Sequence, residues 1–215
     1  MSVFVVSIDG TDFSGKTTIA NLVIGLLRQM NRGQNVQFKR TEVPSGFITG
    51  AFTKILRNSA DKIPAEVFAL AYAGDHLFHY NHYIKSLEKH GGNFVVVQER
   101  SLLSTFIYQG ILGKTDMTWL KEINKFDKNI PKLTLILKVP VEEIIKRKSL
   151  ENEHRQFDKF EELDHLKRQA QAYYNLPADL VKAFHVEYVD GTGPPVRIAE
   201  RCANRIQKEL EKFVK

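Results

Sequence analysis

The sequence has little cysteine, no long apolar stretch and no segment of biased composition. Cys202 is the single cysteine among 215 residues, which excludes an intramolecular disulfide and fits a reducing compartment. There is no apolar run of about 18 residues and no charged segment leading into an apolar one, so we expect neither a secreted nor a membrane-spanning chain. Ser/Gly linkers, low-complexity tracts and internal repeats are also missing. These absences predict one cytoplasmic domain over residues 1–215.

The charge balance is basic, but charges of both signs are interspersed. Lys and Arg number 31 against 25 Asp and Glu, which gives a formal net charge of +6. An excess of this size admits anionic partners. However, segments such as RIQKELEKFVK (205–215) mix the two signs as solvated helical faces do. We therefore expect no nucleic-acid partner.

Short apolar runs alternate with longer segments of helical periodicity. The expected strands are residues 3–9, 35–41, 93–99, 133–139 and 185–190. The expected helices are residues 16–31, 47–58, 63–90, 101–127, 140–176 with a polar interruption, and 194–214. Strands separated by helices form parallel sheets covered on both faces. The pattern predicts a three-layer α/β fold with a five-stranded parallel sheet, whose sites lie beyond the carboxyl ends of the strands.

The first such loop carries a phosphate-binding motif. GTDFSGKT (10–17) satisfies G-x-x-x-x-G-K-[ST] between an expected strand and an expected helix, which is the context that the motif needs. Glycines let the backbone amides turn toward phosphate oxygens, and the helix start adds partial positive charge. Lys16 would reach the β and γ phosphates of ATP, and Thr17 would bind Mg²⁺. The expected ATP-binding residues are Gly10, Thr11, Asp12, Phe13, Ser14, Gly15, Lys16, Thr17 and Thr18.

A second loop follows the third expected strand. Glu99 and Arg100 end that strand, so both should stand at the same sheet edge as the phosphate loop. A carboxylate there can hold Mg²⁺, and an arginine can bind a second phosphate bidentately. The alternative is a surface Glu-Arg ion pair, which the neighbouring phosphate loop disfavours.

Four motifs together resemble the thymidylate kinase family. DGTDFSGKTT, TEVPSG, ERSLLSTFIYQG and FDKFE look like the successive motifs of these enzymes, in the same order and through most of the chain. The resemblance implies a P-loop NTPase fold and transfer of the ATP γ-phosphate to dTMP with Mg²⁺. It also implies a homodimer, which we expect to form through the helices of residues 47–90.

The resemblance assigns roles to residues around the acceptor. Asp12 corresponds to the acid that accepts a hydrogen bond from the 3′-hydroxyl of the nucleotide. Arg100 corresponds to the residue that binds the acceptor's phosphate, and Glu99 to the residue that serves the metal. Tyr108 looks like the tyrosine that packs under the sugar and excludes a 2′-hydroxyl. Ser104, Gln109 and Tyr108 belong to the same motif and are expected to contact the acceptor.

Two motifs depart from the family pattern. In AYAGDH, His76 stands where an arginine normally bonds the base carbonyl, while Tyr72 keeps the aromatic position expected to stack on the base. In TEVPSG, Glu42 stands at an arginine position, so Arg40, Arg100 or another residue would have to hold the acceptor's phosphate. Pro44 keeps its place and is expected in the wall near the base.

The catalytic cation is expected in the lid, about residues 147–158. The family places a basic residue either in the phosphate loop or in the lid, and the loop position here is Phe13, which carries no charge. Phosphoryl transfer requires positive charge on the oxygens of the transferred group. Arg155 is the first candidate and Arg147 the second, beside Lys16 and Arg100.

Two other functions remain open at this point. A deoxynucleoside kinase also has a phosphate loop and an E-R-S motif, and it would use Glu42 as a base on a sugar hydroxyl. A catalytically weak nucleotide-binding protein is the other alternative, because Glu42 and His76 alter the acceptor motifs.

Overall fold

The five strands form one parallel sheet, as the alternation predicts. The computed structural model describes residues 2–59, 61–150 and 163–214. Its strands are β1 (Ser2–Asp9), β2 (Gln37–Glu42), β3 (Asn93–Glu99), β4 (Leu133–Lys138) and β5 (Val186–Asp190). Their spatial order is β2-β3-β1-β4-β5, and every neighbouring pair is parallel. All five carboxyl ends therefore meet at one edge of the sheet.

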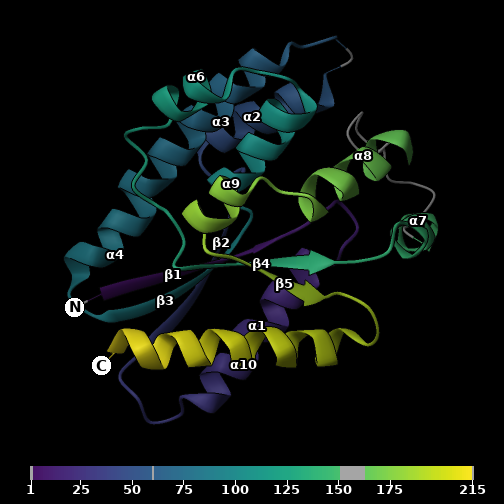
Figure 1. Cartoon of the computed structure of the whole chain (residues 1–215). Coiled ribbons are helices and arrows are strands. Elements are labelled where there is room, and N and C mark those ends of the chain that lie inside the picture. The colour runs from purple at the N-terminus through teal and green to yellow at the C-terminus, as the bar shows by residue number, and fades with distance from the viewer. Residues whose placement is uncertain (1, 60, 151–162, 215) are drawn as a thin grey trace.

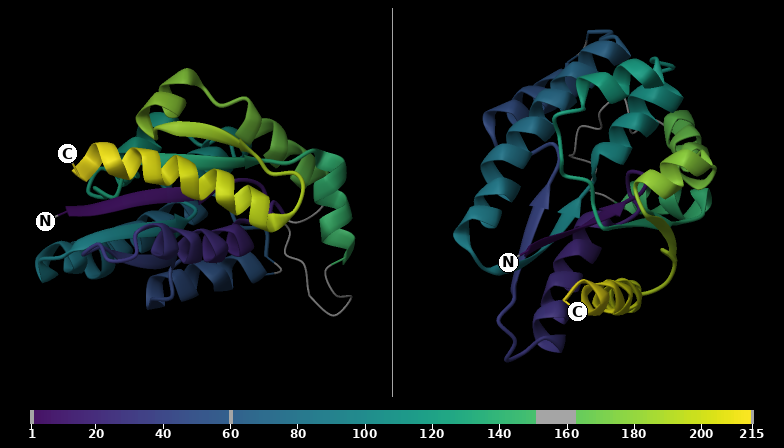
Figure 2. Two further views of the ribbon diagram at one scale, coloured as in Figure 1. Left: turned by 90° about the horizontal axis from the view of Figure 1, so that it is seen from below. Right: turned by 60° about the vertical axis from the view of Figure 1, so that its left-hand side comes forward.

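Helices cover both faces of the sheet (Figure 1). Helices α1 (Lys16–Met30) and α10 (Pro195–Val214) lie together below the sheet as drawn. Above it lie α2 (Ile48–Asn58), α3 (Ala65–His79), η1 (Tyr80–Ile84), α4 (Lys85–His90), α5 (Leu102–Thr105), η2 (Phe106–Leu112), α6 (Met117–Ile123), α8 (Leu163–Tyr174) and α9 (Ala178–Ala183). Helix α7 (Val141–Leu150) stands beyond the end of β4. The right-hand view of Figure 2 shows the same layers, with the sheet between the two sets of helices.

Alternation along β1 divides the core between the two faces. Phe4, Val6 and Ile8 belong to the cluster that contains the buried faces of α1 and α10. Val5 belongs to the opposite cluster, with Ile84 of η1. Near its carboxyl end β1 places a polar residue, Ser7, where the earlier positions are apolar. The hydrophobic core thus gives way to polar groups at the edge where the loops begin.

Some element boundaries differ from the periodicity. The expected helix 63–90 contains a π-helical turn, η1, and the expected helix 101–127 divides into α5, η2 and α6. The break between η2 and α6 falls at Lys114, which has a left-handed φ of 59°, and the Asp116 side chain then caps α6 by accepting from the Trp119 amide at 2.7 Å. Helix α9 was not expected. Within the described ranges, no helix combines the length and apolarity needed to cross a membrane.

Candidate active site

The phosphate loop joins β1 to α1 in a conformation that requires glycine. Gly10 and Gly15 have φ of 142° and 90°, which side chains rarely tolerate. A Cβ on Gly10 would also lie 2.9 Å from Ser14 Oγ. Phe13 packs against the apolar cluster of Val139 and Ile144, so its side chain is part of the wall of the loop. The loop therefore supplies backbone amides and a helix start, while its aromatic residue serves packing.

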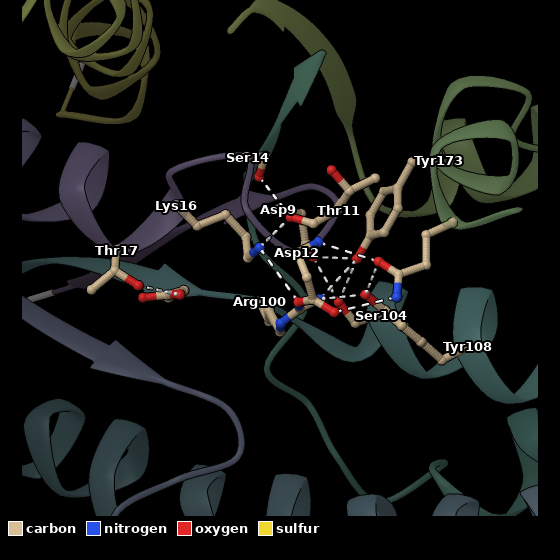
Figure 3. Close-up of polar contacts among 12 residues, drawn as sticks. Asp9, Thr11, Asp12, Ser14, Lys16, Thr17, Arg100, Ser104, Tyr108 and Tyr173 are labelled. Carbon is tan, nitrogen blue, oxygen red and sulfur yellow. Dashed lines mark hydrogen bonds and ion pairs between the residues drawn. The ribbon is translucent and has the colours of Figure 1, made fainter. Parts of the chain in front are cut away.

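Lys16 is buried at the start of α1 (Figure 3). Its Nζ donates to the Thr11 carbonyl at 2.6 Å and lies 4.0 Å from an Asp12 carboxylate oxygen. Burial and the charge of Arg100 together lower the pKa of Lys16 to about 8, although Asp12 and Glu99 oppose the shift. The lysine is held ready beside the loop by short contacts that an incoming phosphate can replace.

Thr17 and Glu99 bring a hydroxyl and a carboxylate into contact beside the phosphate loop. The Thr17 hydroxyl donates to Glu99 Oε1 at 2.8 Å, and Arg40 donates to Glu99 Oε2 at 2.8 Å. A hydroxyl and a carboxylate are the hard donors that Mg²⁺ prefers, so these residues fit that ion. Their proximity follows from the sheet, because β3 ends next to β1 and the loop that follows β1.

Arg100 and Asp12 form a buried ion pair on the other side of the loop (Figure 3). One Arg100 nitrogen contacts Asp12, and another donates to the hydroxyls of Tyr108 at 3.3 Å and Tyr173 at 3.2 Å. Arg100 adopts a left-handed φ of 63° at the end of β3, which turns its side chain toward the loop. Burial alone would raise the pKa of Asp12, but the charges of Arg100 and Lys16 lower it to about 2. Asp12 is thus ionised at neutral pH.

Asp9, the last residue of β1, is connected to this pair through a cluster of hydrogen bonds. Its buried carboxylate accepts hydrogen bonds from Ser7 (2.9 Å), Ser101 (3.0 Å), Ser104 (2.7 Å) and Tyr173 (3.2 Å). Because Tyr173 also accepts from Arg100, the cluster connects the end of β1 to the arginine. Asp9 and Tyr173 were not among the expected site residues. The sequence signal for these two residues is weak, because Asp9 and Tyr173 are far apart in the chain and come into contact only in the folded structure.

Gln169 of α8 also joins this group without having been expected. It accepts from the Asp12 amide at 3.2 Å and donates to the Asp12 carboxylate at 3.3 Å. The Tyr108 hydroxyl donates to the same Gln169 oxygen at 3.1 Å. The acid expected at the sugar and the tyrosine expected beneath it are therefore held by one amide.

A pocket opens beside Arg100, and a polar groove runs from it along the phosphate loop. The pocket contains six of the expected acceptor residues; its lining is Val43, Arg57, Tyr72, His76, Arg100, Ser101, Ser104, Thr105, Tyr108 and Gln109. The groove is lined by Asp12, Phe13, Gly15, Lys16, Thr17, Thr18, Glu42, Val43, Pro44, Lys54, Arg57, Glu99, Arg100 and Arg147. Asp12, which the resemblance assigns to the acceptor, and Pro44 thus lie in the groove, next to the pocket. The expected donor and acceptor residues are continuous in space.

His76 is part of the inner wall of the pocket. Its Nε2 lies 3.3 Å from the Thr105 hydroxyl, and its Nδ1 lies 3.9 Å from an Asp127 oxygen. Burial lowers the pKa of His76 to about 4, so the imidazole is neutral at pH 7. Both ring nitrogens therefore face protein groups, and the side chain carries no charge at the position where the family has an arginine.

Arg57 supplies a cation that the motifs do not predict. It stands on the last turn of α2 and lines both the pocket and the groove. Its guanidinium hydrogen-bonds the Tyr72 hydroxyl, and its charge lowers the pKa of Asp12. Arg40, the replacement considered from the sequence, is instead paired with Glu99 and with Glu42 at 3.3 Å. Arg57 is thus better placed than Arg40 to meet an anion in the pocket.

Of the two lid candidates, Arg147 lies within the described residues. Arg147 of α7 donates to the Ser14 carbonyl at 3.1 Å and to the Gly191 carbonyl at 3.0 Å, and it pairs with Glu143 at 3.0 Å. It therefore lies across the phosphate loop. Arg155 and residues 151–158 of the expected lid lie outside the described residues.

The phosphate loop, the adjacent Thr17 and Glu99 side chains and the adjoining second pocket are typical of a P-loop phosphotransferase of the nucleoside monophosphate kinase class. A sequence model described as "Thymidylate kinase" matches residues 8–192. The chain belongs to the thymidylate kinase family.

The chain is also similar in sequence to individual proteins named as thymidylate kinases. A probable thymidylate kinase of Methanococcus maripaludis is 32% identical over 200 residues, covering 91% of this chain and 90% of that protein. One from Caldivirga maquilingensis is 33% identical over 151 residues, covering 69% of each chain. A thymidylate kinase of Symbiobacterium thermophilum is 26% identical and covers 100% of this chain and 93% of its own.

Proposed function

We propose that the protein transfers the γ-phosphoryl group of ATP to dTMP, forming dTDP and ADP in dTTP biosynthesis. The observation that carries this proposal is the Asp12–Arg100 pair, which lies between the phosphate loop and the pocket. A carboxylate beside a phosphate site repels the phosphates, so its presence there calls for another role. Accepting a hydrogen bond from a sugar hydroxyl is a suitable one. Arg100 next to that acid is suited to the acceptor's phosphate.

The donor would lie along residues 10–18. Loop amides and Lys16 would bind its phosphates, and Thr17 with Glu99 would hold Mg²⁺, which supplies charge neutralisation when bound. Arg147 would reach the donor from α7, because it already contacts the loop at Ser14. The acceptor would extend from Asp12 and Arg100 into the pocket, with Tyr72 against its base and Tyr108 beneath its sugar.

Transfer in this arrangement requires no general base. A phosphate monoester is mostly ionised at pH 7, so its oxygen can attack directly once aligned. A deoxynucleoside kinase would need a base on the sugar hydroxyl. Its candidate, Glu42, is engaged by Arg40 at 3.3 Å and Lys54 at 3.6 Å. The monophosphate reaction is therefore the better match to the groups present.

Coupled ADP release with ATP, Mg²⁺ and one acceptor at a time tests the proposal. We expect turnover with dTMP and none with thymidine. Turnover with thymidine alone would establish the nucleoside kinase instead. ATP binding without turnover of any acceptor would establish a nucleotide-binding protein of little catalytic power.

Arg155→Ala should lower kcat by about 10²-fold or more with little change in the KM of either substrate. The reason is that one cationic donor to the transferring phosphoryl group would be lost, and such a group acts mainly in the transition state. Steady-state kinetics with both substrates measures the effect, and Lys146→Ala serves as a neighbouring control. An unchanged kcat would move the role to Arg147, whose Ala variant would then show the loss.

A homodimer is proposed through the apolar surface of α2 and α3. Side chains on these helices are exposed and line a shallow groove between them: Ile48, Phe52, Val67 and Leu70, with Ile55 nearby. Large apolar patches on a folded domain mark contact surfaces. A second copy presenting the same patch satisfies two-fold symmetry, in which like surfaces meet.

Ile55→Glu should convert the dimer to a monomer, because it places a charge within the apolar surface proposed to be buried. Ile55 is 68% exposed in the single chain, and Phe126, 64% exposed and outside α2 and α3, offers a matched control as Phe126→Glu. Sedimentation equilibrium measures the mass of each variant. A monomeric wild-type chain, or equal dissociation by both variants, would contradict this interface.

A further inference from the structure

Gln109 is a buried amide in the acceptor pocket whose oxygen has no hydrogen-bond partner. It lies on η2, is 3% exposed and lines the pocket with Tyr72 and His76. Its Oε1 accepts no hydrogen bond from any described residue. Buried polar atoms are nearly always paired, and leaving one unpaired is costly. A partner supplied by a bound ligand explains why the amide is kept there.

Both cations that line the pocket are engaged by other groups of the site, Arg100 by Asp12 and Arg57 by the Tyr72 hydroxyl. Arg100 pairs with Asp12, and the charges of Arg100 and Arg57 act on Asp12 and Tyr108, the groups proposed to hold the sugar. The charges that act on His76 come from Asp75 and His79, and its own imidazole is neutral. His76 and Gln109 therefore present neutral polar groups to a base bound in the pocket.

Thymine and cytosine differ in the edge that an amide can contact. Thymine presents an N3–H donor and an O4 acceptor, whereas cytosine presents an N3 acceptor and an N4–H₂ donor. A glutamine amide carries both an acceptor and two donors, and a half turn about its last torsion exchanges them. A fixed cation would favour the thymine carbonyl and oppose the cytosine amino group. His76 provides no such cation, and no described residue donates a hydrogen bond to the Gln109 amide oxygen.

We infer that the acceptors of this enzyme are pyrimidine deoxynucleoside monophosphates of both kinds, dCMP as well as dTMP, with the Gln109 amide turning to match either base. This inference rests on the proposed function and specifies its substrate class. Tyr72 contacts the face of either ring equally well, because stacking does not depend on the polar edge. The Gln109 amide would therefore discriminate little between the two bases.

Steady-state kinetics of the full chain with ATP and Mg²⁺ tests this, with dTMP, dUMP, dCMP and dGMP as acceptors. We expect kcat/KM for dCMP to be at least about one twentieth of that for dTMP, since sites built for one hydrogen-bonding pattern discriminate by about 10⁴-fold or more. A lower value alongside turnover of dTMP would overturn the inference and leave the proposed function intact. Failure of every monophosphate would overturn both. Use of dGMP as good as that of dCMP would show an open pocket and also overturn the role of the amide.

Two variants separate the amide from general pocket shape. Gln109→Leu should reduce kcat/KM for dTMP and dCMP by similar factors, about tenfold or more each, whereas Gln171→Leu on the exposed face of α8 should change neither. His76→Arg should lower the dCMP to dTMP ratio at least about tenfold by adding a fixed donor. A loss confined to dTMP in Gln109→Leu would overturn the inference. Calorimetric titration of the same variants with each monophosphate gives the ratio independently of turnover.

Discussion

Replacing Arg100 with methionine should lower kcat/KM for dTMP by about 10³-fold, the largest loss we expect from a single acceptor-side change. Methionine keeps the unbranched apolar stem but removes the cation that pairs with Asp12 and would pair with the acceptor's phosphate. Breaking one buried charged pair costs about 3–5 kcal/mol because the remaining charge stays unpaired. Steady-state kinetics at varied dTMP and saturating ATP measures the loss.

The result must be separated from a loss of folding. Arg205→Met removes a surface arginine that pairs with Glu187 and Glu209, far along the chain from the site, and should leave kcat/KM unchanged. A thermal melt monitored by circular dichroism shows whether Arg100→Met remains folded. A folded Arg100→Met variant with nearly normal kcat/KM would remove Arg100 from the acceptor site.

Replacing Lys16 with methionine should lower kcat by about 10³-fold, because charge on the transferring phosphoryl group is then neutralised less well. The same lysine predicts a pH dependence. Burial holds its pKa at about 8, below the usual 10.5, so Lys16 is charged below that pH and loses its proton above it. We therefore expect kcat/KM for ATP, which reports the free enzyme, to fall as pH rises through about 8.

Lys16→Arg is the informative companion, because arginine stays charged throughout this range. Its profile should be flat above pH 8 at a reduced level, while the exposed Lys208→Met should keep the wild-type profile. A wild-type profile that remains flat to pH 10 would show that Lys16 does not titrate there.

The sequence was sufficient for features that depend on local spacing. The alternation of short apolar runs with helical segments predicted the parallel sheet, because buried parallel strands are short apolar runs. The loop 10–17 together with Glu99 and Arg100 predicted the sheet edge where the site lies, and the structure brings these residues together. The roles of these residues remain predictions, but their proximity is confirmed.

What could not be predicted depends on contacts between distant segments. Asp12 and Gln169 are separated by 157 positions, so no local sequence pattern predicts the hydrogen bonds between them. The neutral state of His76 depends on its burial, which only the packed structure reveals. Arg57 belongs to none of the motifs, and its place in the pocket and the groove is seen only in the folded chain. The π-helical turns were missed because such turns are rare and occur as short insertions within α-helical segments.

Asp12 belongs to the loop proposed to hold the donor, yet its carboxylate contacts the arginine proposed to hold the acceptor. Binding of either substrate therefore changes the electrostatic environment of the other. Thermodynamic linkage requires the effect to be reciprocal: the factor by which ATP changes the affinity for dTMP equals the factor by which dTMP changes the affinity for ATP. One carboxylate thus makes occupancy of the two sites interdependent, with no need for movement elsewhere in the protein.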